Sequence, residues 1–349
     1  MSTTRMVSNV SAPSTGAEGL VEPLLKIHDR IRDAVIDACE RQSSAQLAAV
    51  VAESPSDSDT IYSIDRVGEE VFVEGLAGLA RREPIHLVGE GLPGGSLVLP
   101  NGTDERACRW RVLVDPIDGT RGLMYQKRSA WILTGIAPNN GDSTRLRDIV
   151  FAVQTEIPLV KQHLSDQLWA VRGRGVEAWR YDRLSCARER LSLRPSTAAG
   201  IGHGFATLVR FFPGARDVLA AIDDDIAQSL LPPTPGKAGC FEDQYMSTGG
   251  QLYELIAGHD RFIADLRPLM QSVRSARGLP AGLCCHPYDL CTALIAEEAG
   301  VILTDSSGAP ADAPFDAVAD VAWVGYANER VRTAVEPVLQ DALHRRGLL

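Results

Sequence analysis

Two carboxylates and a hydroxyl lie within six residues in the stretch Asp115-Pro116-Ile117-Asp118-Gly119-Thr120. The stretch follows Val112-Leu113-Val114, an apolar run typical of a buried strand. Pro116 has a fixed φ angle and no N–H group, so we expect the strand to end there. Gly119 permits a turn that other residues resist, and a short helix should begin after it. The sequence therefore predicts a strand, a tight turn and a helix, with acidic side chains at the turn.

These side chains suit a metal ion and a phosphate. Asp115 and Asp118 can bind a hard cation together with the carbonyl oxygen of Ile117, because such cations prefer oxygen ligands. Thr120 and the free N–H groups at the start of the new helix can hold a phosphate. The same residues also fit an ordinary turn in which an Asp or Thr side chain caps the helix without any ligand.

Two more carboxylates stand at the ends of predicted elements. Residues 85–88 form a short apolar run that predicts a buried strand, and Glu90 follows it. Asp289 precedes residues 290–300, a helical pattern that ends at glycine and leads into a predicted strand at 301–305. One carboxylate at a strand end is more often a solvated cap than a ligand. Several of them at element ends favour a shared metal site.

These motifs resemble those of the inositol monophosphatase and fructose-1,6-bisphosphatase superfamily of Mg²⁺-dependent, lithium-sensitive phosphatases. The resemblance is carried by Gly89-Glu90, the stretch from Asp115 to Thr120, and Tyr288-Asp289 followed by Glu298-Ala299-Gly300. It extends from about residue 23 to about residue 336, and the central motif is the most specific. It implies an α/β (α+β) fold, a layered α-β-α-β-α sandwich with two subdomains and the active site between them.

The resemblance also implies roles for individual residues. The side-chain metal ligands would be Glu90, Asp115, Asp118 and Asp289, and Ile117 would bind through its carbonyl. Asp65 falls where the superfamily has an acidic residue that holds a metal-bound water and is associated with a third ion. We therefore expect two or three Mg²⁺ ions and inhibition by Li⁺.

The expected chemistry is attack of a metal-activated water on the phosphate. Glu90 and Thr120 would orient and deprotonate that water, because a carboxylate and a neighbouring hydroxyl can share its proton. The N–H groups of Gly119 and Thr120 would hold the phosphate oxygens.

Three positions depart from the pattern of the superfamily. Gly91 stands where a second acidic residue is common, and Tyr288 stands where Trp is usual. Arg121-Gly122-Leu123 replaces an Asn-Phe type continuation. None of these removes a predicted metal ligand, but they argue against a narrow substrate assignment such as inositol 1-phosphate.

Substrate selection is expected to lie with later residues. Asp265 follows a predicted strand, near the place where the superfamily has an acidic contact to a polyol hydroxyl. Thr248 and Gly249 could line the same pocket, and Asp118 could contact substrate as well as metal. A solvated ion pair between Asp265 and Arg267 is the alternative. Residues 268–283 form a longer connection than is usual, which could remodel the pocket or contribute to a dimer contact.

Composition restricts the remaining classes of function. The chain has 349 residues, 45% of them hydrophobic, which is enough for a large core and two domains. Its net charge of −10 argues against a nucleic-acid polymer as partner, because phosphate-backbone recognition normally needs a basic face. Bound Mg²⁺ would then supply positive charge for a small phosphorylated metabolite. The seven cysteines show no pairing pattern, and no run is long and apolar enough for a membrane span, so we expect a cytoplasmic protein with reduced thiols and no membrane partner.

The chain is predicted to divide into three parts. Residues 1–20 read as a disordered tail, 21–195 as an N-terminal metal- and phosphate-binding subdomain, and 196–349 as a C-terminal substrate-selecting subdomain, with a Pro- and Gly-rich boundary. Two amphipathic helices are expected early in the chain. The first has its apolar stripe at Leu24, Ile27, Ile31, Val35 and Ala38, and the second has its stripe at Val67, Val71, Leu76 and Leu79.

These features together predict a phosphoric monoester hydrolase of the inositol monophosphatase-like branch, expected to be a homodimer. Its substrate would be an inositol phosphate or a related polyol or sugar phosphate. A fructose-1,6-bisphosphatase and a 3′-phosphoadenosine-type nucleotidase are alternatives within the enzyme class. A catalytically silent regulator that binds a phosphorylated metabolite is the alternative from another class, and the intact set of predicted ligands weighs against it.

Overall fold

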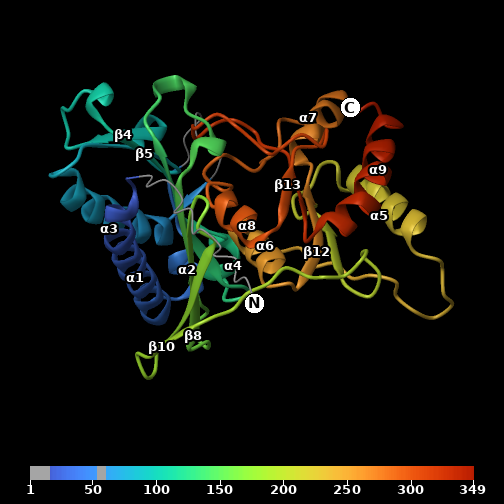
Figure 1. Ribbon diagram of the computed structural model, residues 1–349, viewed down its shortest axis with the longest axis horizontal. Helices are drawn as coiled ribbons and strands as arrows, with labels where there is room; N and C mark the ends of the chain where they lie inside the picture. Colours follow the sequence, from blue (N-terminus) through green and yellow to red (C-terminus); the bar gives the residue numbers. More distant parts are fainter. Residues whose placement is uncertain (1–15, 53–59) are drawn as a thin grey trace, which may run out of the picture.

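The computed structural model describes residues 16–52 and 60–349, which form five alternating layers of helix and sheet. Figure 1 shows an outer pair of helices, a large sheet, a central pair of helices, a small sheet and a second outer pair of helices, from left to right. This is the α-β-α-β-α sandwich that the resemblance implies. Three clusters of buried apolar side chains hold the layers together.

The large sheet has eight strands in a mixed arrangement. Its strands in spatial order are β10 (Arg188–Arg190), β9 (Val176–Asp182), β8 (Leu164–Val171), β7 (Phe151–Ile157), β6 (Ala130–Pro138), β5 (Trp110–Asp118), β3 (Ile85–Gly89) and β4 (Ser96–Leu99). Only β3 and β5 run parallel, and every other neighbouring pair is antiparallel. The ends of two parallel strands meet at one edge of a sheet, so the residues that follow β3 and β5 are brought together.

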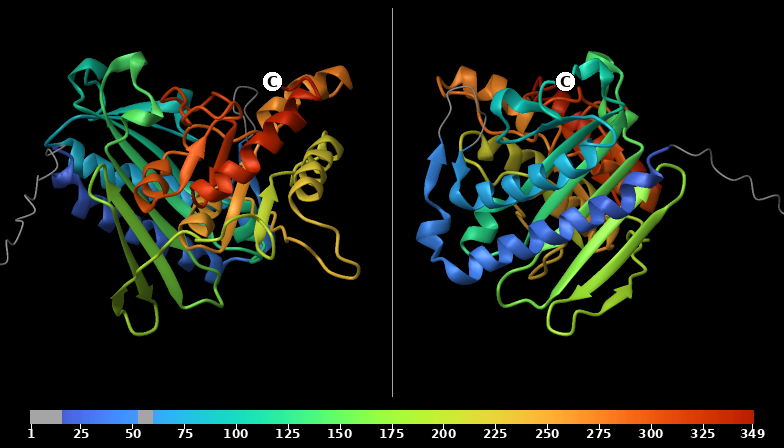
Figure 2. Two further views of the ribbon diagram at one scale, coloured as in Figure 1. Left: turned by 45° about the vertical axis from the view of Figure 1, so that its right-hand side comes forward. Right: turned by 90° about the vertical axis from the view of Figure 1, so that its left-hand side faces the viewer.

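Helices α1 (Glu18–Arg41) and α3 (Ser63–Ala80) cover the outer face of this sheet, as Figure 2 shows. All five apolar residues predicted to form the stripe of α1 are buried. In α3 the fully buried stripe lies one position away from the predicted one for most of its length. It consists of Ile64, Gly68, Phe72, Leu76 and Ala80. Gly68 belongs to it because a Cβ atom there would lie 3.1 Å from both Pro116 Cβ and Ile117 Cγ1, so glycine lets α3 pack closely on β5.

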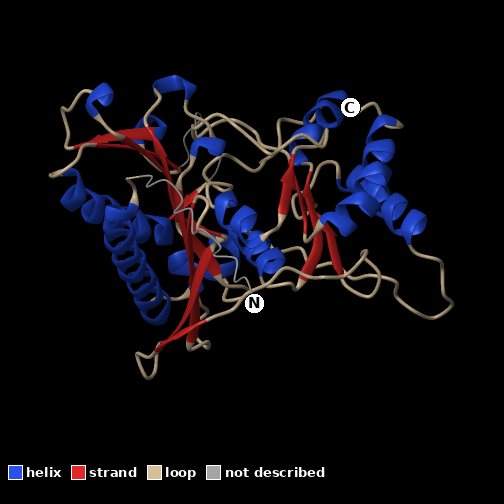
Figure 3. Ribbon diagram, viewed as in Figure 1, coloured by secondary structure: helices blue, strands red, loops and turns tan. Residues whose placement is uncertain are grey.

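The small sheet has four strands and lies between two pairs of helices, as Figure 3 shows by colour. Its strands in spatial order are β11 (Phe205–Leu208), β12 (Asp260–Asp265), β14 (Trp323–Tyr326) and β13 (Ile302–Thr304). The central helices α6 (Thr248–Ile256) and α8 (Ala293–Ala299) separate it from the large sheet. Helices α5 (Arg216–Leu230) and α9 (Glu329–His344) cover its outer side.

The remaining elements are short. They are α2 (Ser44–Leu47), β1 (Val50–Ala52), β2 (Ile61–Tyr62), α4 (Thr120–Met124), α7 (Met270–Ala276) and the 3₁₀ turns Pro93–Gly95, Glu105–Ala107, Gly141–Ser143, Leu146–Asp148 and Arg267–Leu269. All seven cysteines are free thiols. Over the described residues, none of the helices is both long enough and apolar enough to cross a bilayer.

The strand expected to end at Pro116 continues to Asp118. Asp115 pairs with Leu133 of β6 and Asp118 pairs with Trp131, so three steps along β5 match two steps along β6. The extra residue is a β-bulge, which accommodates proline because the ladder is interrupted there. Successive side chains of a regular strand alternate between faces, so residues three apart would point to opposite sides. The bulge allows Asp115 and Asp118 to point into the same space.

Two other boundaries differ from expectation. Helix α8 begins at Ala293, and the residues from 287 to 292 that were partly assigned to it form turns. Helix α1 begins at Glu18, so residues 18–20 of the expected disordered tail are helical, and residues 1–15 lie outside the described residues. The expected subdomain boundary after residue 195 falls between β10, the last strand of the large sheet, and β11, the first strand of the small one.

Candidate active site

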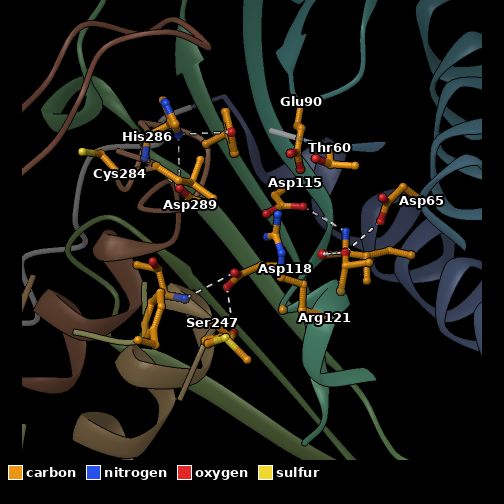
Figure 4. Close-up of a pocket in the computed structure, with 18 of the residues that line it drawn as sticks. Thr60, Asp65, Glu90, Asp115, Asp118, Arg121, Ser247, Cys284, His286 and Asp289 are labelled. Carbon is orange, nitrogen blue, oxygen red and sulfur yellow. Dashed lines mark hydrogen bonds and ion pairs between the residues drawn. The ribbon is translucent and has the colours of Figure 1, made fainter. Parts of the chain in front are cut away.

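A pocket lies beside the bulge of β5 and the residue that follows β3, and its walls come from both halves of the chain. Figure 4 shows the side chains that line it. The first turns of α3, α4 and α6 reach it, and so does the segment from 283 to 289. Of the residues predicted from sequence, those that line it are Asp65, Glu90, Asp115, Ile117, Asp118, Gly119, Thr120, Thr248 and Asp289.

Three of these carboxylates form a compact cluster. Asp115, Asp118 and Asp289 each offer an oxygen, and the three oxygens lie within 4.8 Å of one another. Asp115 and Asp118 are only 2% and 6% exposed. Glu90 lies in the same pocket and points toward Asp115. Such a set of oxygen donors suits a hard divalent cation and offers no nitrogen or sulfur ligand that zinc would favour.

The electrostatics of the cluster indicate that it needs a positive charge. Burial raises the pKa of Asp115 well above its usual value, and the charges of Glu90, Asp118 and Asp289 raise it further. Burial also raises the pKa of Asp289 to about 7, with Asp118 as the next cause. Burial raises the pKa of Asp118 to about 6, against the opposing effect of its hydrogen bonds. Neighbouring buried carboxylates cannot all ionise without compensation, and a bound cation would provide it.

Asp118 is held by the start of helix α6. Its Oδ2 atom accepts hydrogen bonds from Ser247 Oγ at 2.8 Å and from the Gly249 N–H at 2.6 Å, and its Oδ1 atom accepts a longer one from the Thr248 N–H at 3.3 Å. Ser247 also caps α6, because its Oγ accepts from the Gly250 N–H at 2.8 Å. The α6 terminus, from the second half of the chain, therefore fixes a ligand candidate from the first.

Asp289 is fixed more locally. Its Oδ2 atom accepts a hydrogen bond from the backbone N–H of His286 at 2.7 Å. The His286 side chain lines the pocket and stacks on Tyr288, with ring centres 5.2 Å apart. The turn before α8 thus has the same role for Asp289 that the α6 terminus has for Asp118.

Asp65 and Thr120 are in direct contact, although 55 residues separate them. Thr120 Oγ1 lies 2.7 Å from Asp65 Oδ1 and 2.7 Å from the carbonyl oxygen of Ile117. The other oxygen of Asp65 accepts from the Tyr62 N–H at 2.7 Å, which fixes the carboxylate at the first turn of α3. Gly119 precedes Thr120 with φ at +98°, and a Cβ atom there would come within 3.0 Å of Ser247 Cβ. Both the turn and the close approach of Ser247 require glycine.

A carboxylate from α3 occupies the space beside Gly91, where the resemblance expects an acidic side chain. A Cβ atom at Gly91 would lie 2.1 Å from Glu69 Oε1, and Glu69 borders a small cavity together with Asp65, Glu90 and Asp115. Burial raises the pKa of Glu69 to about 7, and Arg66, 3.1 Å away, opposes this shift. The acidic character expected next to Glu90 is therefore present, supplied by another element.

The structure differs from expectation at two of the predicted substrate contacts. Asp265 is fully buried and receives Arg267 Nη2 at 2.6 Å and Nε at 2.8 Å, so its carboxylate is already paired and does not line the pocket. The predicted alternative, an ion pair with Arg267, is present, but it is buried and not solvated. Gly249 uses its N–H to hold Asp118 and is absent from the lining, whereas Thr248 lines it.

Several lining residues were not identified from the sequence as site residues. They include Thr60, Tyr62, Arg121, Phe211, Phe212, Ser247, Arg267, Cys284 and His286. Ser247 had a detectable signal, since a serine directly before a helical pattern is a common cap. The others lie in segments whose position depends on the assembly of the layers, and no local pattern marks them.

Buried hydrogen bonds connect the two segments that position Asp118 and Asp289. Gln154 of β7 is fully buried and donates to the carbonyl of Gly249 at 2.7 Å. Its own carbonyl accepts from the hydroxyl of Thr292 at 3.0 Å, three residues after Asp289. One side chain of the large sheet thus contacts both the α6 terminus that holds Asp118 and the turn that carries Asp289.

Searches of the sequence against protein-family profiles and curated proteins found no match. Solved structures match over nearly the whole chain. Extragenic suppressor protein SuhB from Bartonella henselae aligns with a TM-score of 0.63 and 14% identity, covering 93% of this chain and 99% of its own. An IMPase from Thermotoga maritima aligns with a TM-score of 0.60 and 15% identity, covering 94% and 99%. Fructose-1,6-bisphosphatase from Leishmania major aligns with a TM-score of 0.65 and 13% identity, covering 95% and 99%.

Proposed function

Given that this chain has the fold of the inositol monophosphatase and fructose-1,6-bisphosphatase superfamily, we propose that it is a Mg²⁺-dependent hydrolase of small phosphate monoesters. The observation that carries the proposal is the buried cluster of Asp115, Asp118 and Asp289, whose oxygens lie within 4.8 Å of one another in a pocket that also contains Glu90 and Thr120. The fold alone would not support this assignment, because the same fold can carry different functions.

The residues that would hold Mg²⁺ are Glu90, Asp115, Asp118 and Asp289 through their carboxylates and Ile117 through its carbonyl. Bound Mg²⁺ supplies positive charge for the phosphate oxygens and lowers the pKa of a coordinated water. The raised pKa values of the three clustered aspartates support this assignment, because a bound cation would relieve their mutual repulsion.

Thr120 and Asp65 provide a path for the proton of the attacking water. The Thr120 hydroxyl donates to Asp65 Oδ1 at 2.7 Å, which leaves its oxygen lone pairs free to accept from water. Glu90 and Thr120 together orient the water toward the phosphorus atom. The backbone N–H groups of Gly119 and Thr120 would hold the phosphate oxygens. The reaction then depends on positioning and charge neutralisation and needs no covalent intermediate.

The substrate proposed is a small phosphorylated metabolite of the polyol or sugar type. The names of the similar structures include inositol monophosphatase and fructose-1,6-bisphosphatase, and these describe those proteins. At 13–15% identity they support the class of reaction proposed here and leave the leaving group open.

The test is release of inorganic phosphate from a panel of phosphate esters, with Mg²⁺ and with a chelator. We expect turnover of at least one ester that requires Mg²⁺. Asp115→Asn should lower kcat at least about a hundredfold with the fold retained, because the side chain is placed for the metal and not for packing. Asp224→Asn, on the exposed face of α5, is the matched control and should retain wild-type turnover. Turnover that survives both the chelator and Asp115→Asn would refute the proposal.

A further inference from the structure

One wall of the pocket combines two guanidinium groups with three aromatic rings. Arg121 lies over the rings of Phe212 and Tyr62, with its Cζ atom 5.4 and 5.7 Å from their centres. Arg267 lies over Phe211 and Phe212, at 4.7 and 5.5 Å. All five residues line the pocket, and we call them the arginine-aromatic wall. Phe212 lies within cation–π distance of both guanidinium groups.

Arg267 is the fixed part of this wall. Its side chain is 10% exposed, it forms a bidentate pair with Asp265, and its Nη1 atom donates to the carbonyl of Leu283 at 3.3 Å. The pairing neutralises most of its charge and holds its plane against Phe211. The pairing also occupies the carboxylate of Asp265, which would otherwise be suited to hold the hydroxyls of a neutral sugar or polyol.

Arg121 is the part of the wall that is closest in sequence to the reacting groups. It follows Thr120 directly in the first turn of α4, and Figure 4 shows its side chain extending into the pocket that contains the acidic cluster. A guanidinium group has five N–H donors and no acceptor. It therefore matches the oxygens of a carboxylate or phosphate, often two at once, and suits a neutral polyol less well.

We propose that the arginine-aromatic wall selects phosphate monoesters whose leaving group carries a second acidic group, either a carboxylate or a phosphate, and that Arg121 binds that group. The inference rests on the proposed phosphatase function and specifies its substrate class. Without Arg121, an anionic leaving group would meet a pocket that contains five carboxylates, those of Asp65, Glu90, Asp115, Asp118 and Asp289. The aromatic rings limit access of water to the guanidinium groups and so strengthen their attraction for an anion.

The experiment compares kcat/KM for pairs of esters that differ in the second acidic group. Glycerol 3-phosphate and 3-phosphoglycerate test a carboxylate, and fructose 1-phosphate and fructose 1,6-bisphosphate test a second phosphate. In at least one pair we expect the wild-type enzyme to prefer the doubly acidic ester by about tenfold or more, the usual effect of one charged hydrogen-bonded contact. Arg121→Gln should lower that preference at least about tenfold. Arg81→Gln, an exposed arginine at the end of α3, should leave it unchanged.

Arg121→Lys keeps the positive charge but loses the paired N–H donors of the guanidinium group. We expect it to retain an intermediate preference for the doubly acidic ester. This result would show that the loss in Arg121→Gln does not come from poor folding. Equal falls for both members of a pair in Arg121→Gln would overturn the inference and assign Arg121 to the transferred phosphate. The inference would also be overturned if the wild-type enzyme had nearly equal kcat/KM values for the two esters in both pairs. Failure of the phosphatase proposal is distinct, because no ester of either pair would then release phosphate in a Mg²⁺-dependent way.

Discussion

Thr120 connects three parts of the site, two through its hydroxyl group and one through its backbone. It contacts Asp65 of α3 and the Ile117 carbonyl within the bulge, and its backbone begins α4. A valine has nearly the same shape but can neither accept nor pass on a proton. The role of Thr120 can therefore be separated from its packing.

We expect Thr120→Val to lower kcat by about 10² to 10⁴, the usual contribution of a positioned proton-transfer group, while Mg²⁺ still binds. Single-turnover kinetics and Mg²⁺ titration by calorimetry measure the two effects separately. Thr197→Val, at an exposed position, serves as control. A variant whose kcat stays within about threefold of wild type would remove Thr120 from the proton path.

At the residue scale, the sequence predicted the acidic residues of the pocket better than the rest of its lining. Asp115, Asp118 and Ile117 are neighbours in one motif, and Glu90 and Asp289 follow or precede recognisable elements, so short-range pattern was enough. The pairing of Asp265 with Arg267 was considered, but its burial depends on the layers that enclose it. Glu69 beside Gly91 was not anticipated, because the two residues meet only when α3 packs on the large sheet.

At the scale of elements, Gln154 joins β7 to α6 and to the turn before α8. Gln154→Met keeps the volume but leaves the Gly249 carbonyl and the Thr292 hydroxyl without that partner. The expected cost is about 1 to 3 kcal/mol of the free energy of unfolding, since buried polar groups that lose a hydrogen bond are destabilising. Because both contacts lie next to segments that position aspartates, the affinity for Mg²⁺ should fall as well.

Urea unfolding and calorimetric Mg²⁺ titration test these two effects, with Gln228→Met on the exposed face of α5 as control. Should stability fall while Mg²⁺ affinity and kcat stay at wild-type values, Gln154 would have a structural role only.

Some elements of the fold could be predicted from local sequence patterns, among them α1, α3, β3 and the first part of β5, but their boundaries and pairing could not. The stripe of α1 is confirmed residue by residue, and the family resemblance carried by the three motifs implied the layers that the structure has. The strand end predicted at Pro116 was wrong, because pairing with β6 continues beyond the proline through a bulge. The late start of α8 was missed because residues 290–292 carry a helical pattern but belong to the turns from 287 to 292 that direct Asp289 into the pocket.

At the scale of the whole molecule, a buried polar network lies where the large sheet meets helix α6. Tyr253 of α6 donates to Asp166 of β8 at 2.6 Å, and Arg180 forms a bidentate pair with the same carboxylate. Glu156 of β7 lies beside Asp166, whose N–H donates to it at 3.2 Å. Burial raises the pKa of Glu156 from 4.5 to about 7, and the charge of Asp166 adds to the shift.

The raised pKa makes the stability of the two-sheet assembly depend on pH. The folded state binds the Glu156 proton more tightly than the unfolded state, so the stabilisation is fully present below pH 4.5 and is lost as pH rises through about 7. Glu156→Gln stays neutral and should be more stable than wild type by about 3 kcal/mol at pH 8, with little advantage at pH 4.5.

Chemical denaturation across this range tests the prediction, and Glu189→Gln on exposed β10 is the control. A constant difference in the free energy of unfolding between variant and wild type at all pH values would contradict it.

The homodimer and the cytoplasmic location expected from the sequence stay predictions.

The bulge of β5 makes the number of residues between Asp115 and Asp118 matter, in addition to their chemical type. A strand has parity: residues an odd count apart face opposite ways, and Asp115 and Asp118 are an odd count apart. The extra residue opposite β6 changes that parity once, locally, without disturbing the rest of the ladder. A regular ladder over the same residues would leave the two aspartates on opposite faces and turn one carboxylate away from the other, although every acidic side chain would still be present. The site depends on a count of residues as much as on their identity.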